Sequence, residues 1–123
     1  MKFESFQIHG RGRARELGFP TINLELPKNL KIEYGVYAVF FYCLNKKYLG
    51  AMHYGPSPAF KDEIVSLEVY LVGERDKSLP DFKNQKITVE LIEFIRPVLD
   101  FKTKKELIDR INEDVKKVKS HAR

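Results

Sequence analysis

Apolar and polar residues alternate along much of the first two thirds of the chain, which is typical of β-strands that bury one face. In residues 64–73 this alternation places Leu67 and Val69 on one face and Glu68 and Tyr70 on the other. The same pattern predicts further strands over residues 3–9, 35–44, 45–54 and 86–95, the second and third of these forming a hairpin with a turn at residues 45–47. Stretches rich in Gly, Pro, Asn and Asp separate the segments, so we expect short strands joined by turns.

The last part of the chain has a helical period instead. Within residues 103–120, apolar side chains recur at helical spacing, at Leu107, Ile108, Ile111, Val115 and Val118. Thr103, followed three residues later by Glu106, is the signature of a capping box at the start of this helix. Strands followed by one helix, without βαβ alternation, predict a mainly β fold: an antiparallel barrel or sandwich with a C-terminal helix packed on it.

Length and charge narrow the choice of function. A chain of 123 residues has the size of one domain, so we expect residues 1–123 to fold as a unit. The net charge of +5 favours an anionic partner, for which a nucleotide, a nucleic acid and an anionic membrane all qualify. No apolar run approaches the roughly 20 residues that span a bilayer, and the N-terminus lacks the apolar region of a signal peptide.

Cysteine and histidine usage give two further expectations. Cys43 is the only cysteine, so the chain forms no internal disulfide, and a reducing, cytoplasmic location fits best. His9, His53 and His121 are scattered without the spacing of metal ligands, which argues against a dedicated zinc site.

One loop concentrates positive charge and backbone freedom. It contains the glycines Gly10, Gly12 and Gly18 and the arginines Arg11, Arg13 and Arg15. Glycine lets backbone N–H groups turn toward an anion, and arginine donates charge-assisted hydrogen bonds to phosphate oxygens. The loop has neither the Gly-Lys-Ser/Thr ending of a Walker A motif nor the dinucleotide fingerprint. It is therefore either a phosphate-binding loop or a solvated surface loop.

The segment after this loop adds oxygen ligands. Pro20 biases the preceding residue toward an extended conformation, and in an extended chain Thr21 and Asn23 point the same way while Ile22 points into the core. A hydroxyl and an amide oxygen beside an arginine-rich loop are suited to Mg²⁺, which prefers oxygen ligands and keeps several waters. The alternative is a polar strand face in contact with water.

Glu68 is the candidate for acid–base chemistry. It lies in the middle of a predicted strand among apolar neighbours, with Tyr70 on the same face. A carboxylate within hydrogen-bond reach of a substrate hydroxyl accepts its proton as the hydroxyl attacks phosphorus. The alternative is a glutamate that is simply exposed on a strand.

The order of these motifs resembles the riboflavin kinase family, the module that stands alone in eukaryotes and forms the C-terminal half of bacterial bifunctional FAD synthetases. The matching segments are RARELGFPTIN, GVYAVFF, YLGAMHYGPSPAF, LEVYLV and KITVELIEFIRPVLDFKTKKELIDRINED, which together span roughly residues 6–116. The resemblance implies a six-stranded antiparallel Greek-key β-barrel with a C-terminal helix. It also implies an enzyme that transfers the ATP γ-phosphate to the 5′-hydroxyl of riboflavin, giving FMN. We expect this enzyme to act as a monomer.

The resemblance also implies roles for individual residues. The glycine–arginine loop would lie over the ATP phosphates, Pro20 would shape the turn, Thr21 and Asn23 would hold phosphates and Mg²⁺, and Glu68 would be the general base. The flavin side would be framed by Arg96, Tyr70, Phe101 and Leu107. The His-x-Gly-His motif of the adenylyltransferase half is absent from these residues. We therefore expect them to make FMN but not FAD.

The chain departs from the family pattern at several places, including a few extra residues within 73–83 and the absence of the Asp-Phe that often follows the strand glutamate. Ala14 replaces a glycine of the phosphate loop, Tyr70 replaces a histidine, and residues 53–60 read HYGPSPAF where the family has Asn-Ile-Gly-x-x-Pro-Thr-Phe. The altered segment leaves open a non-catalytic barrel that binds flavin or nucleotide as a sensor or carrier. The positive charge and the strand aromatics leave open a basic barrel that binds nucleic acid.

Overall fold

The computed structural model describes residues 1–9, 18–57, 62–74 and 79–122. Its elements are β1 (Lys2–Ser5), β2 (Gln7–Ile8), β3 (Ile22–Leu24), β4 (Gly35–Cys43), β5 (Lys46–Ser57), β6 (Asp62–Leu71), β7 (Ile87–Arg96) and α2 (Lys104–Lys119). The strands form one antiparallel sheet with the order β1-β7-β4-β5-β6-β3-β2. The predicted mainly β fold with a C-terminal helix is thus confirmed.

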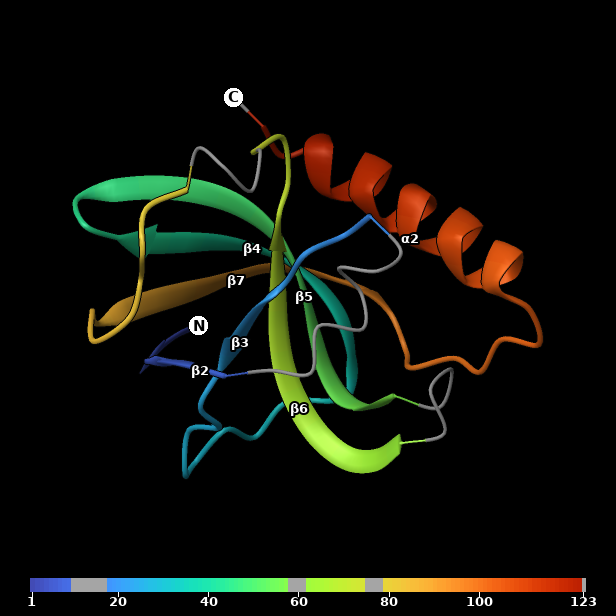
Figure 1. The fold of residues 1–123 in the computed structure, drawn as a ribbon, viewed down its shortest axis with the longest axis horizontal. Helices are drawn as coiled ribbons and strands as arrows, with labels where there is room; N and C mark the ends of the chain where they lie inside the picture. Colours follow the sequence, from blue (N-terminus) through green and yellow to red (C-terminus); the bar gives the residue numbers. More distant parts are fainter. Residues whose placement is uncertain (10–17, 58–61, 75–78, 123) are drawn as a thin grey trace.

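The N-terminal segment links the two ends of this sheet. β1 and β2 are separated by Phe6 alone, yet β1 pairs with β7 at one end of the strand order and β2 pairs with β3 at the other. Because one short segment joins both ends, the sheet curls on itself, and its long strands wrap around a common interior (Figure 1). If β1 and β2 are counted as one interrupted strand, the barrel has the six strands implied by the family resemblance.

The strand order is that of a Greek key. β4, β5 and β6 form a meander of antiparallel neighbours, and the chain then returns by a long connection so that β7 pairs with β4. Three consecutive strands with a fourth beside the first define this topology.

The inner face of the sheet forms the main core, as the alternation along the strands predicts. Its fully buried side chains include Leu24, Val39, Phe41, Met52, Leu67, Val69, Ile87 and Val89. The residues that alternate with them along each strand face outward. The alternation that buries the core therefore also places the candidate functional side chains on the outer face.

Helix α2 covers part of that outer face (Figure 1). Its Val118 packs with Ala38 of β4 and with Val72 in a second, smaller apolar cluster. The predicted helix start is confirmed, because the Thr103 hydroxyl accepts a hydrogen bond of 3.1 Å from the backbone N–H of Glu106. The Glu106 carboxylate accepts one of 3.2 Å from the backbone N–H of Lys102. These bonds fix the residue at which the helix begins.

The hairpin turn lies one residue earlier than predicted. The turn residues are Leu44 and Asn45, whose φ angles are 52° and 63°, and Lys46 and Lys47 already belong to β5. Two consecutive residues with positive φ match the twist of a two-residue hairpin, for which Asn is well suited and Leu is unusual. The prediction at residues 45–47 was wrong because Leu44 is apolar, so the polar/apolar pattern assigns it to the preceding strand and not to the turn.

Candidate active site

A row of side chains crosses the outer face of the sheet from β3 to β7. Asn23 is the register partner of Glu68, Glu68 is the partner of His53, His53 is the partner of Val36, and Val36 is the partner of Arg96. Three of the residues predicted from the sequence, far apart along the chain, thus lie on one line across five neighbouring strands. We call these five residues the cross-strand row.

Hydroxyl groups hold both oxygens of the Glu68 carboxylate. Thr21 Oγ1 donates to Glu68 Oε1 at 3.0 Å, and Ser66 Oγ donates to Glu68 Oε2 at 3.1 Å. Two donors on opposite oxygens fix the orientation of a carboxylate while leaving lone pairs for a third partner. Ser66 was not among the predicted site residues, although it lies two residues before Glu68 on the same strand face.

Strand β3 and the residue before it present side-chain oxygen atoms near the Glu68 carboxylate. Ile22 is buried in the main core, and its neighbours Thr21 and Asn23 are half-buried on the other face, as predicted. Gly18, at the turn that leads into this segment, has a φ of +91°, a conformation that favours glycine. Since the hydroxyl proton of Thr21 is directed at Glu68, its oxygen lone pairs are free to face a cation. The hydroxyl of Thr21 and the amide oxygen of Asn23 fit Mg²⁺, which prefers oxygen ligands and keeps several waters.

At the other end of the row, Arg96 is locked to the helix. Its Nε lies 2.9 Å from Asp114 Oδ1, its Nη2 lies 2.8 Å from Asp114 Oδ2, and its Nη1 donates to the Pro97 carbonyl at 3.1 Å. Both side chains are buried. Asp114 was not predicted, but it could have been found: it falls three residues after Ile111 and four before Val118, on the apolar stripe of the helix.

The other predicted flavin residues are near this end or beside β3. The guanidinium carbon of Arg96 lies 5.8 Å from the centre of the Phe101 ring. Tyr70 makes an edge-to-face contact with Phe19, with ring centres 5.4 Å apart, and packs against the apolar cluster under α2. Leu107 is half-buried on α2. Their role in flavin binding stays a prediction.

Burial shapes the electrostatics of the row at His53. Desolvation lowers the pKa of the imidazole below its ordinary value, and the positive charge of Arg96 adds to this. The carboxylates of Glu68 and Asp114 and the Pro56 carbonyl act in the opposite direction. The net shift keeps the ring neutral at physiological pH.

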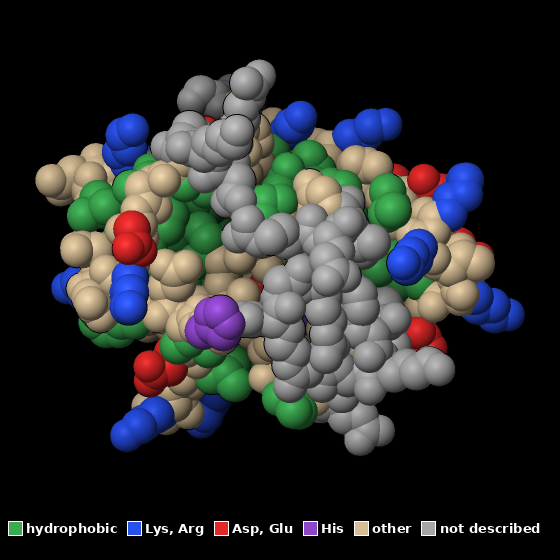
Figure 2. All heavy atoms as spheres, viewed as in Figure 1, with side chains coloured by type: hydrophobic (Ala, Val, Ile, Leu, Met, Phe, Trp, Pro, Cys, Tyr) green, Lys and Arg blue, Asp and Glu red, His purple; other side chains and the backbone are tan. Residues whose placement is uncertain are grey.

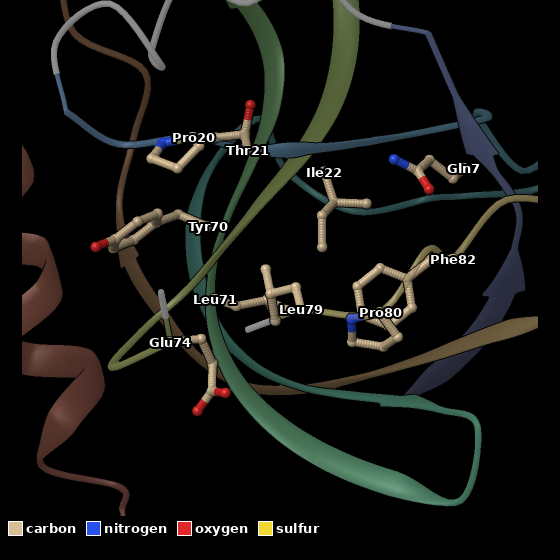
Figure 3. A pocket seen from close by; sticks show the side chains of 10 residues that line it. All are labelled: Gln7, Pro20, Thr21, Ile22, Tyr70, Leu71, Glu74, Leu79, Pro80 and Phe82. Atoms are coloured by element: carbon tan, nitrogen blue, oxygen red, sulfur yellow. The ribbon is translucent and has the colours of Figure 1, made fainter. Parts of the chain in front are cut away.

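A small cavity borders Thr21. Its volume is about 120 Å³, and it is lined by Gln7, Pro20, Thr21, Ile22, Tyr70, Leu71, Glu74, Leu79, Pro80 and Phe82. Figure 3 shows apolar side chains around its centre and the amide of Gln7 turned toward them. Gln7 Oε1 is buried without a hydrogen-bond partner among the described residues. The cavity thus has largely apolar walls, the unpartnered oxygen of Gln7 and the carboxylate of Glu74, and it borders Thr21.

Some predicted residues lie outside the described part of the chain. These are Gly10, Arg11, Gly12, Arg13 and Arg15 of the glycine–arginine loop, together with Ala14 and residues 58–60. On the face shown in Figure 2, the described lysines and arginines lie around the outline with acidic groups between them. Among the described residues, no helix combines the length and apolar character needed to cross a membrane.

Comparison with known proteins shows the family to which the chain belongs. The family model described as Flavokinase, riboflavin kinase, matches residues 1–122. A bifunctional riboflavin kinase/FMN adenylyltransferase of Buchnera aphidicola is 35% identical over 93% of this chain and 36% of its own length. One of Listeria monocytogenes is 32% identical over 87% of this chain and 33% of its own length. The chain therefore spans about a third of these curated relatives.

One solved structure supports the fold alone. It is described as a macrolide-efflux protein from Streptococcus pneumoniae and superposes with a TM-score of 0.79 at 24% identity. The match covers 99% of this chain and 39% of that one.

Proposed function

Because this chain belongs to the flavokinase family, we propose that it is a riboflavin kinase, which transfers the γ-phosphate of ATP to the 5′-hydroxyl of riboflavin. The products are FMN and ADP. The observation that carries the proposal is the carboxylate of Glu68, held by the hydroxyls of Thr21 and Ser66 and facing Asn23 across the sheet. We further propose that residues 1–123 act as one cytoplasmic, monomeric kinase unit.

The geometry supports general-base catalysis by Glu68. As the ribityl 5′-oxygen forms its bond to the γ-phosphorus, the bond from phosphorus to the bridging oxygen of ADP breaks, and Glu68 takes the proton of the attacking hydroxyl. Thr21 and Ser66 each donate to one carboxylate oxygen, so the base is oriented before the substrate arrives. Positioning and charge neutralisation are the main requirements of phosphoryl transfer.

Thr21 and Asn23 are the residues that would hold Mg²⁺ on the phosphates. When bound, this ion neutralises the phosphate charge. Thr21 contacts both the base and the cavity beside Gln7, so we place the nucleotide on this side of Glu68. Arg96, Phe101 and Leu107 lie toward α2, so we place the flavin ring on the other side. Tyr70, which the resemblance assigns to the flavin side, lines the cavity on the nucleotide side instead.

The test is FMN formation from riboflavin and Mg-ATP, followed by chromatography, for the parent and for Glu68→Gln. Gln keeps an oxygen that accepts a hydrogen bond but removes the base, so turnover is expected to fall by about 10²–10⁴-fold with little change in nucleotide binding. The matched control is Glu90→Gln, because Glu90 is also a half-buried strand glutamate that accepts from a hydroxyl, that of Tyr42 at 2.7 Å. This control is expected to keep its activity. A parent that makes no FMN contradicts the proposal, and full activity of Glu68→Gln contradicts the base assignment.

A further inference from the structure

His53 occupies the middle of the cross-strand row without a partner for one of its ring nitrogens. It lies on β5, directly opposite Glu68 on one side and Val36 on the other. Its Nδ1 is buried and has no hydrogen-bond partner among the described residues, although the Pro56 carbonyl lies close enough to the ring to raise its pKa. A buried polar atom left without a partner destabilises the folded protein unless a ligand completes it.

The surroundings of His53 indicate which chemical group can form a hydrogen bond with Nδ1. The charged groups that act on the ring are Glu68 from β6, Arg96 from β7 and Asp114 from α2, and the Arg96 and Asp114 charges are paired with each other. Burial lowers the pKa of the imidazole. A neutral ring nitrogen either donates or accepts one hydrogen bond, depending on the tautomer. A hydroxyl does both, so it satisfies Nδ1 in either tautomer.

The proposed reaction places a polyhydroxylated chain over this residue. Neighbouring strands are about 4.8 Å apart, so Glu68 and His53 are one strand apart and Glu68 and Arg96 are three, or about 14 Å along the sheet. The reacting 5′-hydroxyl lies at Glu68 and the flavin ring lies toward Arg96 and α2. The ribityl chain that connects them crosses β5, where His53 is located.

We propose that His53 Nδ1 forms a hydrogen bond with a ribityl hydroxyl next to the one that is phosphorylated, and that this residue selects flavins with a polyol chain. The inference rests on the proposed riboflavin kinase function. It assigns a substrate contact to a residue that the sequence did not single out as part of the site.

The test compares two flavins and two substitutions by quenching of flavin fluorescence. Riboflavin carries the ribityl chain, whereas lumiflavin has the same ring system with a methyl group in its place. His53→Leu removes the polar atoms, and His53→Asn retains a donor and an acceptor. We expect His53→Leu to raise the Kd for riboflavin about tenfold and to leave the Kd for lumiflavin within about twofold, because one hydrogen bond is lost. His53→Asn is expected to stay within about threefold of the parent for both flavins.

The outcomes separate this inference from the function on which it rests. If His53→Leu weakens the binding of riboflavin and lumiflavin equally, His53 only supports the fold of the site. If the Kd for riboflavin is unchanged, His53 makes no contact with it. Either result overturns the inference. If the parent makes FMN while one of these results is found, the kinase assignment stands and the His53 contact does not. If the parent neither binds riboflavin nor makes FMN, both are wrong. The thermal midpoint of each variant shows whether it is folded in the assay.

Discussion

The buried ion pair between Arg96 and Asp114 allows a sharp test of how α2 is held on the barrel. Asp114→Ala removes the carboxylate that accepts from Nε and Nη2 of Arg96 and leaves the guanidinium buried with one remaining bond, to the Pro97 carbonyl. A buried cation without its counter-ion is strongly unfavourable, since the low-dielectric interior no longer compensates for lost hydration. The helix and the segment that follows β7 are therefore expected to lose much of their attachment.

The expected magnitude follows from burial. The two side chains are 8% and 5% exposed, and breaking a buried pair of this kind costs about 3–5 kcal/mol of unfolding free energy. A domain of this size has a total of about 5–15 kcal/mol, so the variant loses a large fraction of its stability. At about 4 °C per kcal/mol, the midpoint of thermal unfolding is expected to fall by about 12–20 °C.

The same helix provides the matched control. Lys105 and Asp109 form an ion pair of 2.9 Å, close to the 2.8 Å of Arg96 and Asp114, but their side chains are 85% and 58% exposed. Asp109→Ala introduces the same residue into the same helix, so the effect of helix propensity cancels, and only a small change in the midpoint is expected.

Circular dichroism during heating measures both variants. The double variant Arg96→Met/Asp114→Leu, which removes both charges and keeps apolar volume, is expected to recover most of the loss. Equal midpoints for Asp114→Ala and Asp109→Ala would refute the argument that burial decides the contribution of these pairs.

Two further predictions concern Thr21 and Cys43. Thr21→Val keeps the β-branched shape but removes the hydroxyl that donates to Glu68, so FMN formation is expected to fall about 10–100-fold. Thr21→Ser keeps the hydroxyl and is expected to retain most of the activity. Equal activities of the two variants would contradict a role for the hydroxyl. Burial raises the pKa of the Cys43 thiol, so the reactive thiolate is scarcer at pH 8 than in an exposed cysteine; we expect slow reaction with a thiol-specific disulfide reagent in the native protein and fast reaction after unfolding, and equal rates would show that the thiol is accessible.

The sequence predicted those parts of the fold that depend on local periodicity. Alternation in residues 64–73 predicted that Leu67 and Val69 enter the core, and both are buried. The helix and its Thr103 cap were predicted from spacing alone. The turn at Leu44 and the closure of the barrel by β1 and β2 were not, because a leucine with positive φ and the pairing of one segment with two distant strands leave no local pattern.

The candidate site was predictable as a set of residues but not as an arrangement. Thr21, Asn23 and Glu68 were identified by type and spacing, but their meeting depends on the register between β3 and β6, which is a tertiary property. The partners Ser66 and Asp114 act through other side chains, and such partners give a weak signal in one sequence. In the sequence His53 is one of three scattered histidines and a departure from the family pattern, and the cross-strand register is what places it beside Glu68.

The two faces of the sheet separate stability from chemistry, and this decides how variants at the site should be read. Glu68 and His53 are half-buried on the outer face, while their strand neighbours Leu67 and Met52 lie in the core, so substitutions at the first two leave the core packing in place. Arg96 differs, because its ion pair joins the last strand to α2 and also borders the region proposed for the flavin ring. Loss of flavin binding in an Arg96 or Asp114 variant therefore reports on helix attachment first. Only a variant such as His53→Leu, compared with two flavins, isolates a contact with the substrate.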